Sequence, residues 1–126
     1  MQRFAKILAL ALVLSLVMGA TAFAAPKATF HIGIVTGTVS QSEDDLRGAE
    51  KLIELYGSVK DGGMIQHITY PDDFMSQQET VISNIVSLAD DPLMKAIVVN
   101  QSIPGTAEAF KRVRERNPNI LLLAGE

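Results

Sequence analysis

Side chains that could bind a polar molecule lie in four short segments of this 126-residue chain, at positions 36–41, 70–73, 100–102 and 125–126. Each segment follows a run of apolar residues. Hydroxyl, amide and carboxylate groups exchange hydrogen bonds with small polar solutes, which predicts a binding site assembled from these segments. The candidate ligand-binding residues are Thr36, Gly37, Thr38, Ser40, Gln41, Tyr70, Asp72, Asn100, Gln101, Ser102 and Glu126. The same residue types are common in ordinary turns and helix caps, so a structural role stays open for each of them.

An acid–base enzyme is the alternative that these segments leave open. Asp72, Asp73 and Glu126 could donate and accept protons if two of them had separated pKa values beside a bound substrate. The sequence contains neither the Gly-x-Ser-x-Gly of a nucleophile elbow nor a phosphate-binding Gly-Lys-Ser/Thr. Thr36-Gly37-Thr38 is not a dinucleotide fingerprint either. We therefore expect a binding protein without a catalytic residue or a cofactor.

The pattern of ligand-type residues does not indicate a metal site. The chain has two histidines, His31 and His67, which both lie inside expected strands, and it has no cysteine. A zinc site would need a third ligand at suitable spacing, so structural roles are favoured for both histidines. The acidic pairs at 44–45 and 72–73 would suit the phosphoacceptor pocket of a receiver domain, but Asn100 stands where that pocket needs an aspartate.

Tyr70 is the aromatic residue of the expected site. Its ring could stack on a sugar or another planar ligand, or it could cover the edge of the sheet. Tyrosines serve in both ways, so the sequence leaves these two roles open.

Residues 1–24 have the organisation of a secretory signal peptide. Arg3 and Lys6 give a positive start, residues 7–18 are apolar, and Ala22-Phe23-Ala24 places small residues at the cleavage site. The apolar run is shorter than the ~20 residues that a membrane-spanning helix needs, which disfavours an uncleaved anchor. We predict cleavage after Ala24 and export to the periplasm or the cell exterior.

The charge of the chain argues against nucleic acids and anionic membranes as partners. The formal net charge is −3, and the predicted cleavage removes Arg3 and Lys6 but no acidic residue. An acidic domain without a basic stripe binds nucleic acid poorly and lacks the polybasic face that holds proteins on membranes. The absence of cysteine also excludes disulfides and the cysteine-linked anchor of bacterial lipoproteins. After cleavage we expect the protein to be free of the membrane.

Helices and strands alternate in the rest of the chain. Apolar, β-branched runs predict strands at 30–36, 64–70, 96–100 and 120–124. The first helix is expected to end at Gly57 and to start at one of two capping boxes, Ser40 to Glu43 or Ser42 to Asp45. Ser76 with Glu79 predicts the start of the second helix, and Pro104 predicts the first turn of the third.

The order β-α-β-α-β-α-β predicts an α/β protein with a Rossmann-like parallel sheet, right-handed crossovers and helices on both faces. Ligands of such sheets gather at the carboxyl ends of the strands, which is where the four polar segments fall. The last strand is as apolar as the third, and no covering helix follows it. We therefore expect residues 25–126 to be an incomplete N-terminal lobe.

Three stretches of the chain resemble the N-terminal lobe of type I periplasmic binding proteins. They are Ile32-Gly33-Ile34-Val35-Thr36-Gly37, Asp45-Leu46-Arg47-Gly48-Ala49-Glu50 and Lys95-Ala96-Ile97-Val98-Val99-Asn100-Gln101. A first strand ending in a polar loop, a helix with a central Gly-Ala and a strand after a short Asp-Pro turn are typical of that group. Residues 36–45 and 123–126 are also similar to those of a poorly characterised family of exported bacterial proteins with this fold.

The resemblance implies two lobes of similar size, joined by a hinge, that close on a solute held between them. It implies a protein that hands a small polar solute to a membrane transporter or sensor. A third possibility is an interaction module whose exposed sheet face pairs with another chain, which predicts a dimer.

Overall fold

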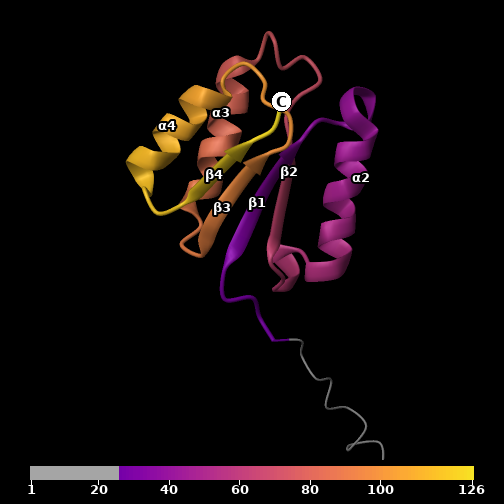
Figure 1. Cartoon of the computed structure of the whole chain (residues 1–126), viewed down its shortest axis with the longest axis vertical. Coiled ribbons are helices and arrows are strands. Elements are labelled where there is room, and N and C mark those ends of the chain that lie inside the picture. Colours follow the sequence, from indigo (N-terminus) through magenta and orange to yellow (C-terminus); the bar gives the residue numbers. More distant parts are fainter. Residues whose placement is uncertain (1–25) are drawn as a thin grey trace, which may run out of the picture.

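The computed structural model describes residues 26–126 (Figure 1). The predicted signal peptide, residues 1–24, and its cleavage site after Ala24 lie outside the described residues. Those described residues include one four-stranded sheet, with strands β1 (His31–Thr36), β2 (Ile65–Thr69), β3 (Met94–Val99) and β4 (Leu121–Ala124). The strands lie in the order β2-β1-β3-β4, and every neighbouring pair is parallel. The predicted α/β class with a Rossmann-like parallel sheet is confirmed.

Three α-helices cover the sheet from its two sides (Figure 1). Helix α2 (Val39–Tyr56) lies on one side, and helices α3 (Gln78–Ser87) and α4 (Thr106–Arg116) lie together on the other. Short 3₁₀ turns, η1 (Val59–Asp61) and η2 (Leu88–Asp90), precede β2 and β3. The chain steps one way across the sheet from β1 to β2 and the opposite way from β2 to β3 and β4. Right-handed crossovers then require α2 to lie on the face opposite α3 and α4.

Neither of the two predicted capping boxes is formed at the start of α2, where no side-chain hydrogen bond caps the helix. Ser42 has extended backbone angles (φ −156°, ψ 84°), which interrupt the helix after its first turn. Its hydroxyl donates a 2.6 Å hydrogen bond to the Asp45 carboxylate. Ser42 and Asp45 are thus joined only through their side chains where the regular helix begins, while Ser40 belongs to a separate turn that faces the loop after β2. Gly57 ends the helix as predicted, with a positive φ of 77° and its N–H bonded to the carbonyl of Ile53.

The other two helices begin later than the sequence suggested. The Ser76 hydroxyl donates to the carbonyl of Asp73 at 2.9 Å instead of capping α3, which starts at Gln78 without a side-chain cap. The predicted capping box of Ser76 and Glu79 is therefore wrong, because the loop before the helix takes the hydroxyl. Helix α4 starts at Thr106, after Gly105 with a φ of 98°, so Pro104 lies just outside it.

The main hydrophobic core lies between the sheet and the pair α3 and α4. Val35 of β1 and Ile97 and Val99 of β3 point to this side, and each is at most 1% exposed. Ile85 of α3 and Val113 of α4 are 0% exposed and complete the layer. Burial on this scale supplies most of the stabilising free energy of a small domain.

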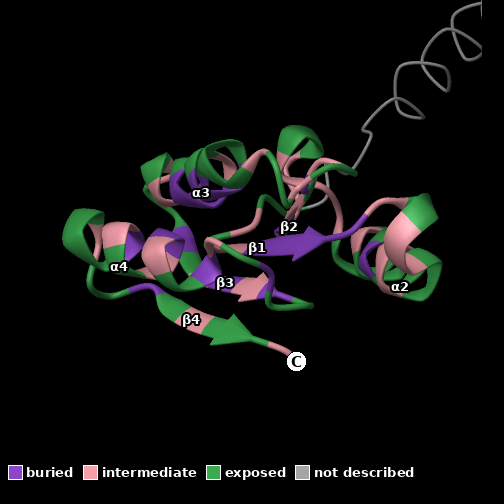
Figure 2. Cartoon of the chain, turned by 90° about the horizontal axis from the view of Figure 1, so that it is seen from above, coloured by how far each residue is buried: buried purple, intermediate pink, exposed green. Residues whose placement is uncertain are grey.

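The opposite face of the sheet is covered only in part. Ala49 of α2 packs against Ile34 and Ile65 of the sheet in a small cluster. The helix does not extend over β4, where Leu121 and Leu123 are 61% and 46% exposed. Figure 2 shows β4 exposed along much of its length at the rim of the molecule. An apolar strand at an exposed sheet edge is a feature that natural proteins normally cover.

Candidate functional site

The loops after β1 and β2 meet at the carboxyl ends of the strands. Thr38 and Ser40, from the turn that precedes the regular part of α2, both donate hydrogen bonds to Oδ1 of Asp72, and the bond from Ser40 measures 2.6 Å. The side-chain amide of Gln41 donates to the carbonyl of Asp72 at 2.7 Å. The separate first turn of α2 is what aims these side chains at the second loop. Four of the predicted binding residues, Thr38, Ser40, Gln41 and Asp72, thus form one cluster.

The electrostatics of this cluster favour an ionised Asp72. The hydroxyls of Ser40 and Thr38 lower the pKa of the Asp72 carboxyl below its ordinary value of 3.8, because their hydrogen bonds stabilise the charged form. The pKa of the neighbouring Asp73 is also lowered, mainly by a hydrogen bond from the Gln77 amide. Both carboxylates are therefore hydrogen-bond acceptors at neutral pH.

The loop after β3 is held beside the end of β4 by backbone hydrogen bonds. The N–H of Ser102 donates to the carbonyl of Gly125 at 2.7 Å, and the N–H of Gly125 donates to Val99 at 2.9 Å. A Cβ at Gly125 would lie 2.1 Å from the carbonyl oxygen of Asn100, so only glycine fits this close approach. The side chains of Asn100, Gln101 and Ser102 remain exposed at the rim.

Tyr70 contributes its hydroxyl to the rim but not its ring. The residue is 2% exposed, and its ring packs edge-to-face on Phe74 with the centroids 5.3 Å apart. The hydroxyl donates to Oε1 of Gln101 at 3.3 Å. Burial is also the main reason why the pKa of Tyr70 is raised above 10.0. Of the two roles left open by the sequence, stacking on a solute does not fit this packing.

The remaining predicted residues differ in how accessible they are. Thr36 is 1% exposed and Gly37 is buried, so their side of the site is covered in this conformation. Glu126 is exposed, and its side chain makes no hydrogen bond with the described residues 26–126. The structure therefore brings the first and second loops together by side-chain contacts, whereas Glu126 stands outside that cluster.

Both histidines have protein partners. Nδ1 of His31 lies 2.5 Å from Oδ2 of Asp91, which links the start of β1 to the turn before β3. Nε2 of His67 lies 2.8 Å from the Thr36 hydroxyl beneath α2. The Thr36 hydroxyl itself donates to the carbonyl of Gly37, which fits a neutral ring that donates from Nε2. Burial lowers the pKa of His67 below its ordinary value of 6.5.

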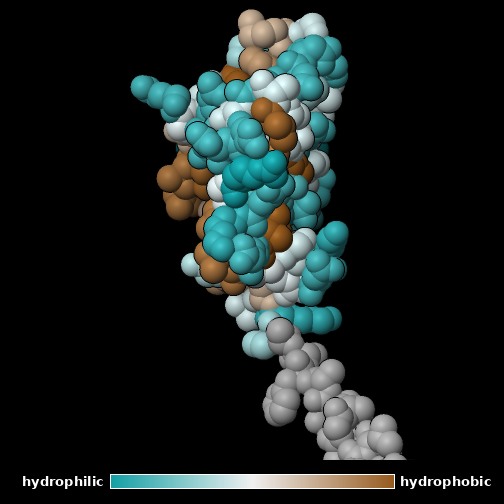
Figure 3. Space-filling model, turned by 90° about the vertical axis from the view of Figure 1, so that its right-hand side faces the viewer, coloured by the Kyte–Doolittle hydropathy of each residue, from teal (hydrophilic) through white to brown (hydrophobic). Residues whose placement is uncertain are grey.

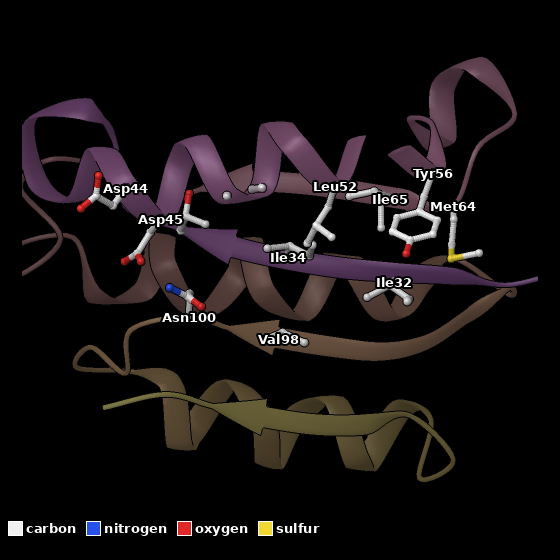
Figure 4. A pocket seen from close by; sticks show the side chains of 13 residues that line it. Ile32, Ile34, Asp44, Asp45, Leu52, Tyr56, Met64, Ile65, Val98 and Asn100 are labelled. Atoms are coloured by element: carbon white, nitrogen blue, oxygen red, sulfur yellow. The ribbon is translucent and has the colours of Figure 1, made fainter. Parts of the chain in front are cut away.

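A groove of about 700 Å³ runs between α2 and the sheet, on the side away from the main core. Ile32, Ile34 and Val98 form its floor, and Leu52 and Tyr56 of α2 form its wall (Figure 4). Figure 3, which looks onto the side that carries α2, shows hydrophobic surface on both flanks of the hydrophilic surface. The groove is therefore mainly apolar along its length.

The polar end of the groove lies at the carboxyl ends of the strands. Asp45 of α2 points toward Asn100 across this end, and Asp44 lies nearby at its mouth (Figure 4). Thr36 also lines this end. The groove shares only Thr36 and Asn100 with the residues predicted for the site, so it is a second feature beside the rim.

The sequence profile of the family described as "Protein of unknown function (DUF3798)" matches residues 30–126. The chain belongs to this family. The match covers all four strands of the sheet and all the rim segments. Membership confirms the similarity of the chain to an uncharacterised family, while the resemblance to periplasmic binding proteins stays a prediction.

Two curated relatives of this DUF3798 chain are both named "Uncharacterized protein" and come from Treponema pallidum (strain Nichols). The first is 46% identical over 99 residues, which are 77% of this chain and 45% of the relative. The second is 45% identical over 42 residues, which are 33% of this chain and 19% of the relative. The chain thus spans less than half the length of the curated relatives it matches.

A solved structure has the same fold as the DUF3798 chain. It is the crystal structure of a "Putative transcriptional regulator" from Clostridium difficile 630, with a TM-score of 0.68 and 25% sequence identity. The similarity covers 79% of this chain and 30% of that one.

Sequence reasoning missed the groove and its acidic end. In the sequence, Asp44 and Asp45 suggested only the phosphoacceptor pocket of a receiver domain, a pocket that Asn100 does not fit. A signal was present in β1, where Ile32 and Ile34 lie on one side of the strand and Val35 on the other. Apolar residues on both sides of a strand indicate that both faces of the sheet are apolar. They do not indicate which face a helix covers.

Residues 26–126 contain neither a metal-binding cluster nor a membrane-spanning helix. Within this range there is no group of three or more His, Cys, Asp or Glu side chains placed to hold a metal ion. None of the helices described there is both long and apolar enough to cross a membrane.

Proposed function

We propose that this chain is the first lobe of an exported solute-binding protein, which binds a small polar solute at the carboxyl ends of its parallel strands. The observation that carries the proposal is the convergence of Thr38 and Ser40 on Asp72. These residues are 32 or more positions apart in sequence, yet they form one exposed hydrogen-bonding cluster. Switch-point rims of open α/β sheets are the usual place for ligands in this class of fold.

The cluster has the chemistry to recognise hydroxyl, amino or amide groups. Asp72 offers an ionised acceptor, and the hydroxyls of Thr38 and Ser40 can turn from Asp72 to a solute as donors or acceptors. Asn100, Gln101 and Ser102 add exposed amide and hydroxyl groups on the third loop. A solute bound here would replace hydrogen bonds to water with hydrogen bonds to the rim, which gives specificity more than affinity.

A second lobe would supply the enclosure that affinity requires. Ligand pockets bury most of a small ligand, and the rim of one lobe is open. The matched relatives are more than twice as long as the part they share with this chain, which leaves room for such a lobe. A membrane transporter or sensor would then recognise the solute-bound protein. The solved structure with the same fold is named a "Putative transcriptional regulator", which fits the sensing role.

The pKa values at the rim favour binding over acid–base catalysis. A carboxylate pair that transfers protons needs one member with a raised pKa, so that it is protonated near neutral pH. The pKa values of Asp72 and Asp73 are both lowered. Proton transfer between Asp72 and Asp73 therefore lacks the separation of pKa values on which it would depend.

Amide NMR spectra of the exported chain would test the proposal. The probes are pentoses, hexoses, amino acids and nucleosides, each titrated separately. We expect at least one class to produce saturable shifts at residues 38–41, 72 and 100–102. The substitution Asp72→Asn keeps the size of the side chain but removes its charge, and should weaken that binding about tenfold, as loss of a hydrogen bond to a charged group does.

Asp61→Asn is the matched control, because Asp61 is exposed on η1 at the amino end of the sheet. This substitution should leave the titration unchanged. The proposal fails if no probe class shifts the rim amides, or if the shifts map elsewhere on the chain. It also fails if the two substitutions weaken binding equally.

A further inference from the structure

We infer that the uncovered part of the sheet beside α2 is the docking surface for an amphipathic helix from the part of the longer family polypeptide that this chain does not span. We call this surface the open face and define it by Ile32, Ala96, Val98, Leu121 and Leu123. The inference is independent of the solute-binding proposal, because it concerns a different surface and a macromolecular partner.

The open face is a continuous apolar strip across three strands. The strand register places Ile32, Ala96 and Leu121 in one row and Ile34, Val98 and Leu123 in the next. The rows are progressively less covered toward β4, where Leu121 and Leu123 are 61% and 46% exposed. Contiguous apolar surface on a folded protein marks an interaction site more often than isolated exposed residues do.

The groove has the form that a second helix beside α2 would fill. One wall is the flank of α2 with Leu52 and Tyr56, which are 37% and 52% exposed, and the floor is the sheet (Figure 4). Gly48 also lines the groove, and a Cβ there would meet no atom within 4 Å. The absence of a side chain at Gly48 would let a neighbouring helix approach α2 closely. A helix in this position would bury the strip as α3 and α4 bury the other face.

Handedness determines which kind of segment can occupy this position. The steps from β2 to β3 and from β3 to β4 both place their helices on the α3 and α4 side (Figure 1). A further strand added beside β4 would continue in the same direction, so its right-handed crossover would also lie on that side. The segment on the open face is therefore not that crossover, and comes from another part of the polypeptide that this chain does not span.

The length of the family polypeptide and the charges at the groove favour this occupant. The Treponema relative extends over more than twice the length it shares with the chain, so the family polypeptide includes a large further segment. At the carboxyl end of the groove, Asp44 and Asp45 make no ion pair with the described residues 26–126. A helix with an aliphatic stripe and a lysine or arginine over this end would complement both the floor and the charge.

Single-cysteine labelling can test the inference, since the chain has no cysteine of its own. The full chain carrying Leu123→Cys is co-expressed with the remainder of the Treponema relative that is 46% identical to it. Met75→Cys, at a residue 70% exposed on the loop after β2, is the matched control. In the chain alone, both thiols should react quickly. In the co-expressed complex, the rate of labelling at position 123 should fall about tenfold or more, because the thiol can react only after the helix dissociates. The rate of labelling at position 75 should be unchanged.

A charge-introducing pair of variants gives a second readout. Leu121→Lys should abolish co-purification of the two parts, whereas Leu93→Lys, at a residue 39% exposed away from the open face, should not. Failure of the two parts to associate, or association without protection at position 123, would overturn the inference. Protection at position 123 in the chain alone that rises with its concentration would show a second copy on the open face, which also rejects the proposed occupant.

Discussion

On one face of the sheet, helices α3 and α4 bury a continuous core, while on the other face α2 covers only the strands nearest to it. Val99 and Val98 are neighbours on β3, yet Val99 is 0% exposed and Val98 lies half-buried on the floor of the groove. The two faces have the same kinds of residues and differ in coverage. The difference shows that the apolar pattern of a strand does not tell which of its faces a helix of this chain covers.

The largest expected effect comes from truncating these neighbouring valines. Val99→Ala should lower the free energy of unfolding by about 2 kcal/mol, because it removes two buried methyl groups and leaves a cavity. Val98→Ala should cost less than about 1 kcal/mol, since its site is already partly open to water. Urea unfolding of the two variants measures this difference in free energy. Because both substitutions are valine to alanine on the same strand, the change in strand propensity cancels in the comparison. Equal losses would mean that the open face is covered in solution, and repeating the measurement at lower protein concentration would then reveal self-association.

A smaller effect of opposite sign is expected at the groove. Gly48→Ala should raise the free energy of unfolding by about 1 kcal/mol, because alanine has the better helix propensity and the added Cβ meets no atom within 4 Å. Thermal or urea unfolding would measure the gain. Gly125→Ala is the contrasting variant, because its Cβ would lie 2.1 Å from the Asn100 carbonyl oxygen, and it should destabilise the chain. A loss of stability at position 48 would mean that the groove is narrower than described.

The smallest effect concerns the covered part of the α2 face, where His67 lies. Its pKa in the folded chain is lowered from 6.5 by burial, so the folded state holds the proton less tightly than the unfolded state does. The stability from the neutral ring is therefore fully present above pH 6.5 and is lost as the pH falls through the folded pKa. Unfolding free energies measured as a function of pH should decline below 6.5 in the wild type. His67→Gln should flatten that part of the profile, and an unchanged slope would assign the decline to other groups.

Much of the secondary structure followed from local patterns. The four apolar runs became the four strands, and Gly57 ended α2, because strand runs and helix ends depend on residues close in sequence. The predicted cap at Ser76 was wrong because the Ser76 hydroxyl bonds to the carbonyl of Asp73 in the preceding loop. That competition depends on the loop conformation, which no short motif encodes.

The residues of the predicted site differ in how far their positions could be predicted from the sequence. The sequence placed Ser40 and Asp72 at the same end of the sheet, because the carboxyl ends of parallel strands meet there, but their contact came from the structure. The burial of Tyr70 was not predictable, since the ring could equally have faced the rim. Its packing on Phe74 depends on the path of the loop between β2 and α3.

The sequence by itself determined the class of the fold and the end of the sheet where polar groups gather, because both follow from the alternation of strands and helices. Only the tertiary structure decided which face is left open and where the groove lies. Those features depend on the strand order β2-β1-β3-β4 and on the side taken by each helix. Both are set by contacts between residues far apart in the chain, and the apolar pattern of β4 is the same whether its outer face meets water, a helix or a partner.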